Sequence, residues 1–151
     1  MSRTLTEVFA ATRAEGRAAL IGYLPAGFPD PVRCVQLITD MVDAGVDIVE
    51  VGLPYSDPLM DGPAIQEAVD IALREGTTPD TVLDTVAAVA ASGATALVMS
   101  YWNPIERYGV ERFADRLADG GGRGVITPDL TPDEAGPWIE ATTRRDLDRV
   151  F

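Results

Sequence analysis

Short apolar runs alternate along the chain with segments whose apolar positions recur at helical spacing. Runs of four to seven residues that are apolar almost throughout predict strands buried on both faces, which is typical of parallel sheets. The predicted strands are Ala18–Leu24, Asp47–Gly52, Ala96–Tyr101, Gly124–Thr127 and Leu147–Phe151, the last of which looks like a strand just starting.

Start and stop signals define the predicted helices between these strands. Thr4 followed by Glu7 has the spacing of a capping box and opens a first helix that ends near Gly16. Asn103–Gly109 is expected to be a loop. The other predicted helices run from Asp30-Pro31 to Ala44-Gly45, over Ala64–Arg74, from Thr78-Pro79 to Ala91, over Val110–Ala118, and onward from Thr131-Pro132 with a kink at Gly136-Pro137.

This alternation predicts an α/β fold built from right-handed βαβ units, either a doubly wound sheet or a (β/α)8 barrel. Polar side chains gather at the predicted carboxyl ends of the strands, where both folds build their sites. They are Tyr23, Glu50, Tyr101, Asn103 and Asp129. A complete barrel has about 250 residues, whereas this chain has 151. We therefore expect residues 1–151 to form a single partial barrel domain with about four βα units and an N-terminal helix, truncated at the start of strand five.

The composition removes several classes of function. The net charge of −12 argues against a nucleic-acid partner. The absence of histidine excludes Ser-His-Asp and Cys-His catalysis within the chain, and the absence of lysine excludes a Schiff base. Cys34 is expected to be a buried free thiol. The N-terminus lacks a signal-peptide pattern and no apolar run reaches the length of a membrane span, so we expect a cytoplasmic protein.

The remaining acid–base chemistry concentrates in the segment VEVGLPYSDPLMDGP, which starts at Val49. Glu50 lies within an apolar strand, and Asp57 and Asp61 lie in the loop that follows. An apolar setting raises the pKa of a carboxyl group and suits it to proton transfer. Three carboxylates could instead hold Mg²⁺, because this ion accepts ligand sets made only of oxygen.

Four strings in order, IGYLPAGFPD, DIVEVGLPYSDPLMDGPAIQEA, MSYWNPIERYG and TPDL, closely resemble the tryptophan synthase α subunit. The resemblance implies a (β/α)8 TIM barrel. It also implies a lyase that cleaves indole-3-glycerol phosphate to indole and glyceraldehyde 3-phosphate without metal or cofactor. The expected partner is the tryptophan synthase β subunit, which carries pyridoxal phosphate, in an αββα complex.

The resemblance also assigns roles to individual residues. The family's two catalytic carboxylates match Glu50 and Asp61. Positions that line the family's indole pocket match Tyr23, Met99, Tyr101, Ile126 and Pro128. Positions that contact the β subunit match Pro54 and Asp57, with Asn103 and Pro104 near the same face.

The resemblance covers only about the first half of the family's barrel. The family binds the substrate phosphate with segments after strands six to eight, which have no counterpart in residues 1–151. We therefore expect the isolated 151-residue chain to be inactive. Two alternatives stay open: a Mg²⁺- or Mn²⁺-assisted barrel enzyme that uses the Glu/Asp cluster, and an inactive half-barrel that only binds a partner.

Overall fold

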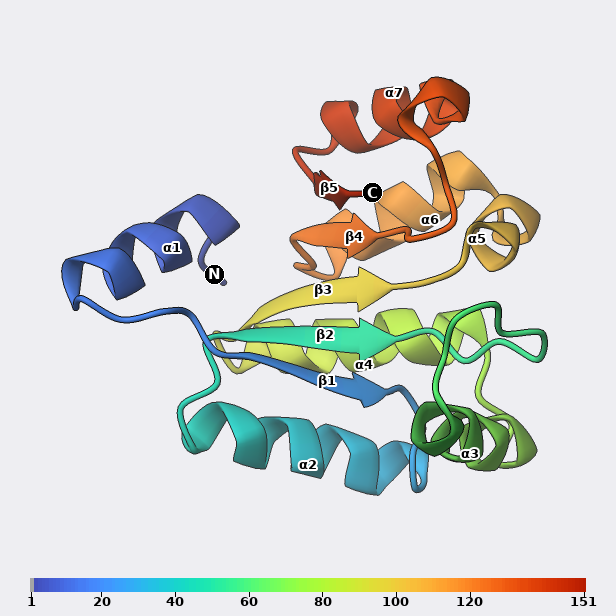
Figure 1. Cartoon of the computed structure of the whole chain (residues 1–151), viewed down its shortest axis with the longest axis horizontal. Coiled ribbons are helices and arrows are strands. Elements are labelled where there is room, and N and C mark those ends of the chain that lie inside the picture. The colour runs from blue at the N-terminus through green and yellow to red at the C-terminus, as the bar shows by residue number, and fades with distance from the viewer. Residues whose placement is uncertain (1) are drawn as a thin grey trace.

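A computed structural model of the chain describes residues 2–151 and contains one sheet of five parallel strands. The strands are β1 (Ile21–Pro25), β2 (Ile48–Gly52), β3 (Thr95–Met99), β4 (Gly124–Ile126) and β5 (Asp148–Val150). They pair in sequence order, β1-β2-β3-β4-β5, so that β1 and β5 are the two edges. The predicted parallel α/β architecture is therefore confirmed (Figure 1).

Helices connect successive strands. They are α1 (Leu5–Ala14), α2 (Pro31–Asp43), α3 (Pro63–Arg74), α4 (Pro79–Ala91), α5 (Trp102–Tyr108), α6 (Val110–Asp119) and α7 (Gly136–Arg144), with a short 3₁₀ helix at Pro132–Glu134. Local signals set several helix starts as expected. Thr4 and Glu7 form the reciprocal capping box of α1, and Asp30 accepts hydrogen bonds from two backbone N–H groups at the start of α2.

The two faces of the sheet bury different clusters. Alternate residues such as Val49 and Val51 point into the main core, which α2, α4, α6 and α7 close on the outer side. Ile48 and Leu97, with the opposite orientation, pack against Val8 of α1 on the inner face. Figure 1 shows α1 beyond the amino ends of the strands, well away from the ends at which the polar residues gather.

One predicted loop is wrong. Asn103–Gly109 lies almost entirely within α5 (Trp102–Tyr108). Pro104 does not prevent this helix, because a proline in the first turn has no intrahelical hydrogen bond to lose. The first N–H of the helix, that of Trp102, donates to Asp129 Oδ1 at 2.9 Å. This capping carboxylate follows β4, so the local sequence does not reveal it.

Two predicted boundaries also shift. The helix expected from Thr131-Pro132 is divided: a 3₁₀ turn ends at Glu134, and α7 starts at Gly136, where a kink was expected. The first strand begins at Ile21 rather than Ala18. Its predecessor, Leu20, donates its N–H to the Asp47 carboxylate instead of to a neighbouring strand.

One smaller expectation is confirmed, because Cys34 is a buried free thiol. The glycine-rich stretch after α6 forms the turn that leads into β4, and Gly121 adopts a positive φ of 83° there. Among residues 2–151, no helix is long and apolar enough to cross a membrane.

Candidate active site

Glu50 sits in the middle of β2, with its side chain on the inner face of the sheet. Its strand neighbours Val49 and Val51 are fully buried on the other face, and in register it lies between Tyr23 of β1 and Leu97 of β3. Glu50 itself is half-buried. This burial raises the pKa of its carboxyl group above the ordinary value, as the apolar strand predicted. The group therefore holds a proton to a higher pH than an exposed glutamate does.

The ring of Tyr23 lies across β2 next to this carboxylate. A Cβ built on Gly52 would stand 2.3 Å from Tyr23 Oη and 2.8 Å from its Cζ, so the ring occupies the space above the glycine. Burial raises the pKa of Tyr23, and the nearby charges of Asp61 and Glu50 raise it further. The phenol of Tyr23 therefore stays protonated, and both candidate carboxylates are close enough to contribute to its raised pKa.

A small cavity joins Tyr23 to Asp61. Its lining comprises Tyr23, Leu53, Met60, Asp61, Met99, Ser100, Tyr101 and Pro128. Four of the five residues predicted for the indole pocket are in this set, together with the second predicted carboxylate. The cavity measures about 20 Å³, enough for about one water molecule. An indole ring would therefore require these side chains to move apart.

Ile126 is the fifth residue that the resemblance assigns to the indole pocket, and it is not part of the cavity lining. It lies on β4 at the level of its register partner Met99, which does line the cavity, and it packs against the cluster of Val8, Ile48 and Leu97. Its role in an indole pocket stays a prediction. Leu53 and Met60 line the cavity and were missed, although both lie inside the string that carries the resemblance.

Hydrogen bonds to its backbone groups hold the loop that carries Asp61 in place. Leu53 N–H donates to Met99 O at 2.8 Å, which continues the β2–β3 pairing past the end of β2. Met60 N–H donates to Tyr101 Oη at 2.9 Å, and Gln66 Nε2 donates to the Asp61 carbonyl at 2.7 Å. These contacts fix an otherwise irregular segment at points close to both of its ends.

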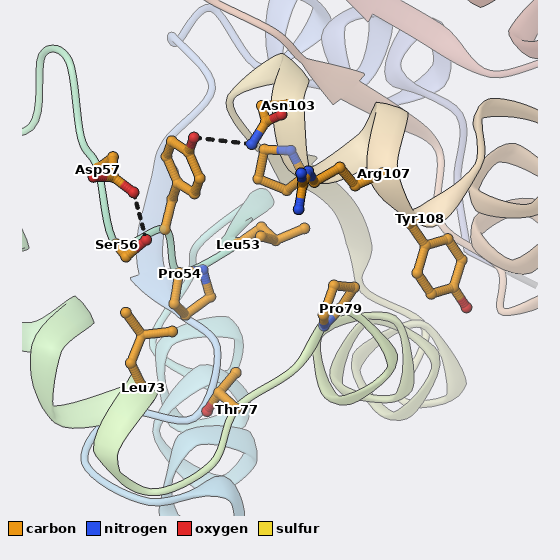
Figure 2. Close-up of a pocket in the computed structure, with 12 residues that line it drawn as sticks. Leu53, Pro54, Ser56, Asp57, Leu73, Thr77, Pro79, Asn103, Arg107 and Tyr108 are labelled. Carbon is orange, nitrogen blue, oxygen red and sulfur yellow. Dashed lines mark hydrogen bonds between the residues drawn. The ribbon is translucent and has the colours of Figure 1, made fainter.

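A second, larger groove opens on the other side of this loop (Figure 2). It measures about 680 Å³ and is lined by Leu53, Pro54, Tyr55, Ser56, Asp57, Leu73, Thr77, Pro79, Asn103, Pro104, Arg107 and Tyr108. The structure thus brings together all four residues predicted for the partner contact, Pro54, Asp57, Asn103 and Pro104. Tyr55, Arg107 and Tyr108 also line the groove and were not predicted.

Two tyrosines lie between the groove and the small cavity. Asn103 Nδ2 donates to Tyr55 Oη at 2.9 Å, which joins α5 to the acidic loop (Figure 2). The rings of Tyr55 and Tyr101 pack at 5.6 Å between centroids. Tyr101 in turn lines the cavity that contains Asp61. The two hollows therefore share one wall, built from the acidic loop and the residues after β3.

The three carboxylates of the acidic segment do not form a ligand set. Among residues 2–151, no three side chains of His, Cys, Asp or Glu come close enough together to hold a metal ion. Asp57 faces the groove and is hydrogen-bonded to Ser56, whereas Asp61 lines the small cavity. The Mg²⁺ alternative, which needed Glu50, Asp57 and Asp61 together, has no ligand set in this part of the chain.

Comparison with known proteins decides the family. The family model described as "Tryptophan synthase alpha chain" matches residues 9–151. The chain belongs to the tryptophan synthase alpha chain family. The Thermobifida fusca tryptophan synthase alpha chain is 59% identical over 147 residues, which cover 97% of this chain and 54% of that protein. The chain thus spans about half the length of the curated relatives it matches.

Solved structures of the alpha chain family share the fold. Tryptophan synthase from M. tuberculosis, in an open form, superposes with a TM-score of 0.96 at 52% identity, over 100% of this chain and 61% of that one. The alpha subunit from Legionella pneumophila gives a TM-score of 0.91 at 33% identity, over 95% and 56% of the two chains. The five parallel strands and their helices are thus part of the (β/α) barrel of this family.

Proposed function

We propose that the protein catalyses the retro-aldol cleavage of indole-3-glycerol phosphate to indole and glyceraldehyde 3-phosphate, the lyase step of tryptophan biosynthesis. Membership of the alpha chain family supports this reaction. The observation that carries it is that Glu50 is the register partner of Tyr23, whose side chain lines the same cavity as Asp61. The proposal concerns the whole protein, because the chain spans about half the length of the relatives it matches.

Glu50 would move the protons in this reaction. Cleavage needs a proton added at indole C3 and one removed from the glycerol hydroxyl. A carboxyl group whose pKa is raised by burial releases its proton less readily than an exposed carboxyl group and accepts one more readily. Its place on the inner face of a central strand keeps it beside Tyr23. This rigid support favours a defined position for the carboxyl group.

Asp61 would stabilise the charge that this protonation creates. Once C3 carries the new proton, the indole ring nitrogen is positive, and a carboxylate at its N–H lowers the energy of that state. Asp61 shares its cavity with the rings of Tyr23 and Tyr101 and with Met99 and Pro128, which offer apolar surface to a flat aromatic ligand. The chemistry requires no metal and no cofactor on this chain.

The groove beside the acidic loop would bind the β subunit of tryptophan synthase in an αββα complex, with pyridoxal phosphate on the partner only. Its 680 Å³ hollow combines apolar walls at Leu53 and Pro54 with opposite charges at Asp57 and Arg107. A cytoplasmic location is part of the same proposal, supported by membership of this biosynthetic enzyme family.

The test is an assay of indole release from indole-3-glycerol phosphate by the whole protein, purified from its native source, with and without a chelator. We expect release that a chelator leaves unchanged. Activity that a chelator abolishes and Mg²⁺ or Mn²⁺ restores would favour the metal-assisted alternative. A protein that binds the β subunit tightly but releases no indole would favour the alternative in which it only binds a partner.

A further inference from the structure

The position of the Asp61 side chain depends on its backbone, because its carboxylate has no hydrogen-bond partner of its own. Among residues 2–151, no hydrogen bond reaches either carboxylate oxygen of Asp61, although the side chain is half-buried. The backbone sets the direction of the Cα–Cβ bond, and its φ and ψ angles limit which side-chain rotamers are allowed. Whatever fixes the backbone at Met60 and Asp61 therefore restricts where the carboxylate can lie.

Tyr101 holds the backbone on the amino side of Asp61. Its hydroxyl accepts the Met60 N–H at 2.9 Å, across 41 positions of sequence. Tyr101 is 5% exposed and follows β3 directly, where Ser100 N–H donates to Ile126 O at 3.0 Å. The acceptor thus belongs to a buried residue whose neighbour in the chain, Ser100, is hydrogen-bonded to β4.

Gln66 holds the backbone on the carboxyl side. Its Nε2 donates to the Asp61 carbonyl at 2.7 Å, while its own N–H donates to Gly62 O at 3.0 Å in the first turn of α3. The amide orientation is fixed chemically, because the opposite orientation would set two oxygen atoms against each other. Gln66 is exposed to solvent, so apolar packing gives no reason for a glutamine at this position.

We propose that Tyr101 and Gln66 are positioning residues that clamp the peptide backbone on both sides of Asp61 and so hold its carboxylate toward the indole nitrogen. The inference rests on the proposed function and adds to it two residues that act through Asp61. For Tyr101 the role belongs to the hydroxyl and is separate from the contact that its ring makes with the cavity. For Gln66 it is the only polar role that the side chain has among the described residues.

The test is a double-mutant cycle with indole release as the readout. Tyr101→Phe keeps the ring and removes the acceptor, and Gln66→Met keeps the length and removes the amide. Each should lower kcat about tenfold or more and leave KM within about threefold, because a misplaced group costs most in the transition state. In an Asp61→Asn background, each should cost less than about twofold.

The matched control is Gln36→Met. Gln36 Nε2 donates to Asp40 on the exposed side of α2, far from the acidic loop, so kcat should stay within about twofold of the parent. Clamp variants that behave like this control would overturn the proposal. So would losses of equal size in the parent and in the Asp61→Asn background, since the residues would then act independently of Asp61.

Amide hydrogen exchange tests the clamp without any activity. The Met60 N–H should exchange about tenfold faster or more in Tyr101→Phe than in the parent, because its only acceptor is gone. Unchanged exchange would overturn the clamp directly. If the parent releases no indole, the proposed function fails, and the exchange result still decides whether Tyr101 fixes the loop. If Asp61→Asn is severe but exchange is unchanged, the function stands and the clamp does not.

Discussion

The phenol ring of Tyr23 occupies the space that a side chain at residue 52 would need. A Cβ on Gly52 would lie 2.3 Å from Tyr23 Oη and 2.9 Å from Cε2, closer than real Cβ contacts come. The glycine at the end of β2 is therefore required by a side chain on β1, and its own backbone φ is not in the left-handed region. This relationship places a phenol beside Glu50, and a substitution at Gly52 can test it.

Gly52→Ala should displace the Tyr23 ring and damage the site while leaving the fold intact. We expect kcat/KM for indole release to fall about tenfold or more, because Tyr23 lines the same cavity as Asp61 and a displaced ring changes the shape of that cavity. The matched control is Gly136→Ala, since Gly136 has an ordinary backbone and no atom within 4 Å of an added Cβ. Equal activity of the two variants would show that the ring can be displaced without cost.

The ionised form of Glu50 should lower the free energy of unfolding at neutral pH. Burial raises the pKa of Glu50 in the folded protein, so the unfolded chain loses its proton first as pH rises. The folded state is therefore favoured by this group below about pH 4, and that advantage is lost as pH rises through the folded pKa. Glu50→Gln, which cannot ionise, should raise Tm at pH 8 and should raise it much less at pH 4.

Thermal unfolding followed at both pH values checks this sign. Glu75→Gln is the control, because Glu75 is exposed at the end of α3 and the same substitution there removes a charge without relieving burial. A Glu50→Gln variant that is less stable than the parent at pH 8 would contradict the account, since it would mean that the ionised carboxylate is favourably paired.

A separate prediction concerns binding of the β subunit at the groove. Asp57→Asn removes a charge from the groove and should weaken binding of the tryptophan synthase β subunit about tenfold, without lowering Tm. Asp70→Asn on exposed α3 makes the same change in charge outside the groove and should bind like the parent. Titration calorimetry with the purified β subunit measures both. If Asp57→Asn also binds like the parent, Asp57 serves only to shape the turn with Ser56.

Local signals in the sequence revealed most of the fold, and the resemblance supplied the candidate site residues, but neither revealed the contacts between those residues. Three helix starts were predictable because the side chain of the N-cap residue accepts a hydrogen bond from a backbone N–H within four residues of it. These N-cap residues are Thr4, Asp30 and Thr78. The helix α5 was missed because its first N–H is capped by Asp129, 27 positions away. The same limit hid the bond between Met60 and Tyr101, since side chains distant in sequence meet only after the sheet forms.

A polypeptide of residues 1–151 should not behave as a clean monomer and should release no indole. Both edge strands carry exposed apolar side chains: Leu20 and Ile21 beside β1 are 56% and 44% exposed, and Val150 and Phe151 at β5 are 44% and 43% exposed. Open parallel edges with apolar surface associate in water. Light scattering, near-UV circular dichroism and an indole assay test this. A monodisperse, sharply folded and active monomer would contradict it.

The most direct test of the central claim is substrate binding and indole release by Glu50→Gln in the protein as its source expresses it. Gln keeps the shape of the side chain but cannot transfer a proton. We expect kcat to fall about 10²-fold or more while indole-3-glycerol phosphate still binds within a few-fold of the parent. Asp61→Asn should cost roughly 2 kcal/mol or more in the transition state. Turnover by Glu50→Gln within a few-fold of the parent would contradict the assignment of Glu50 as the proton carrier.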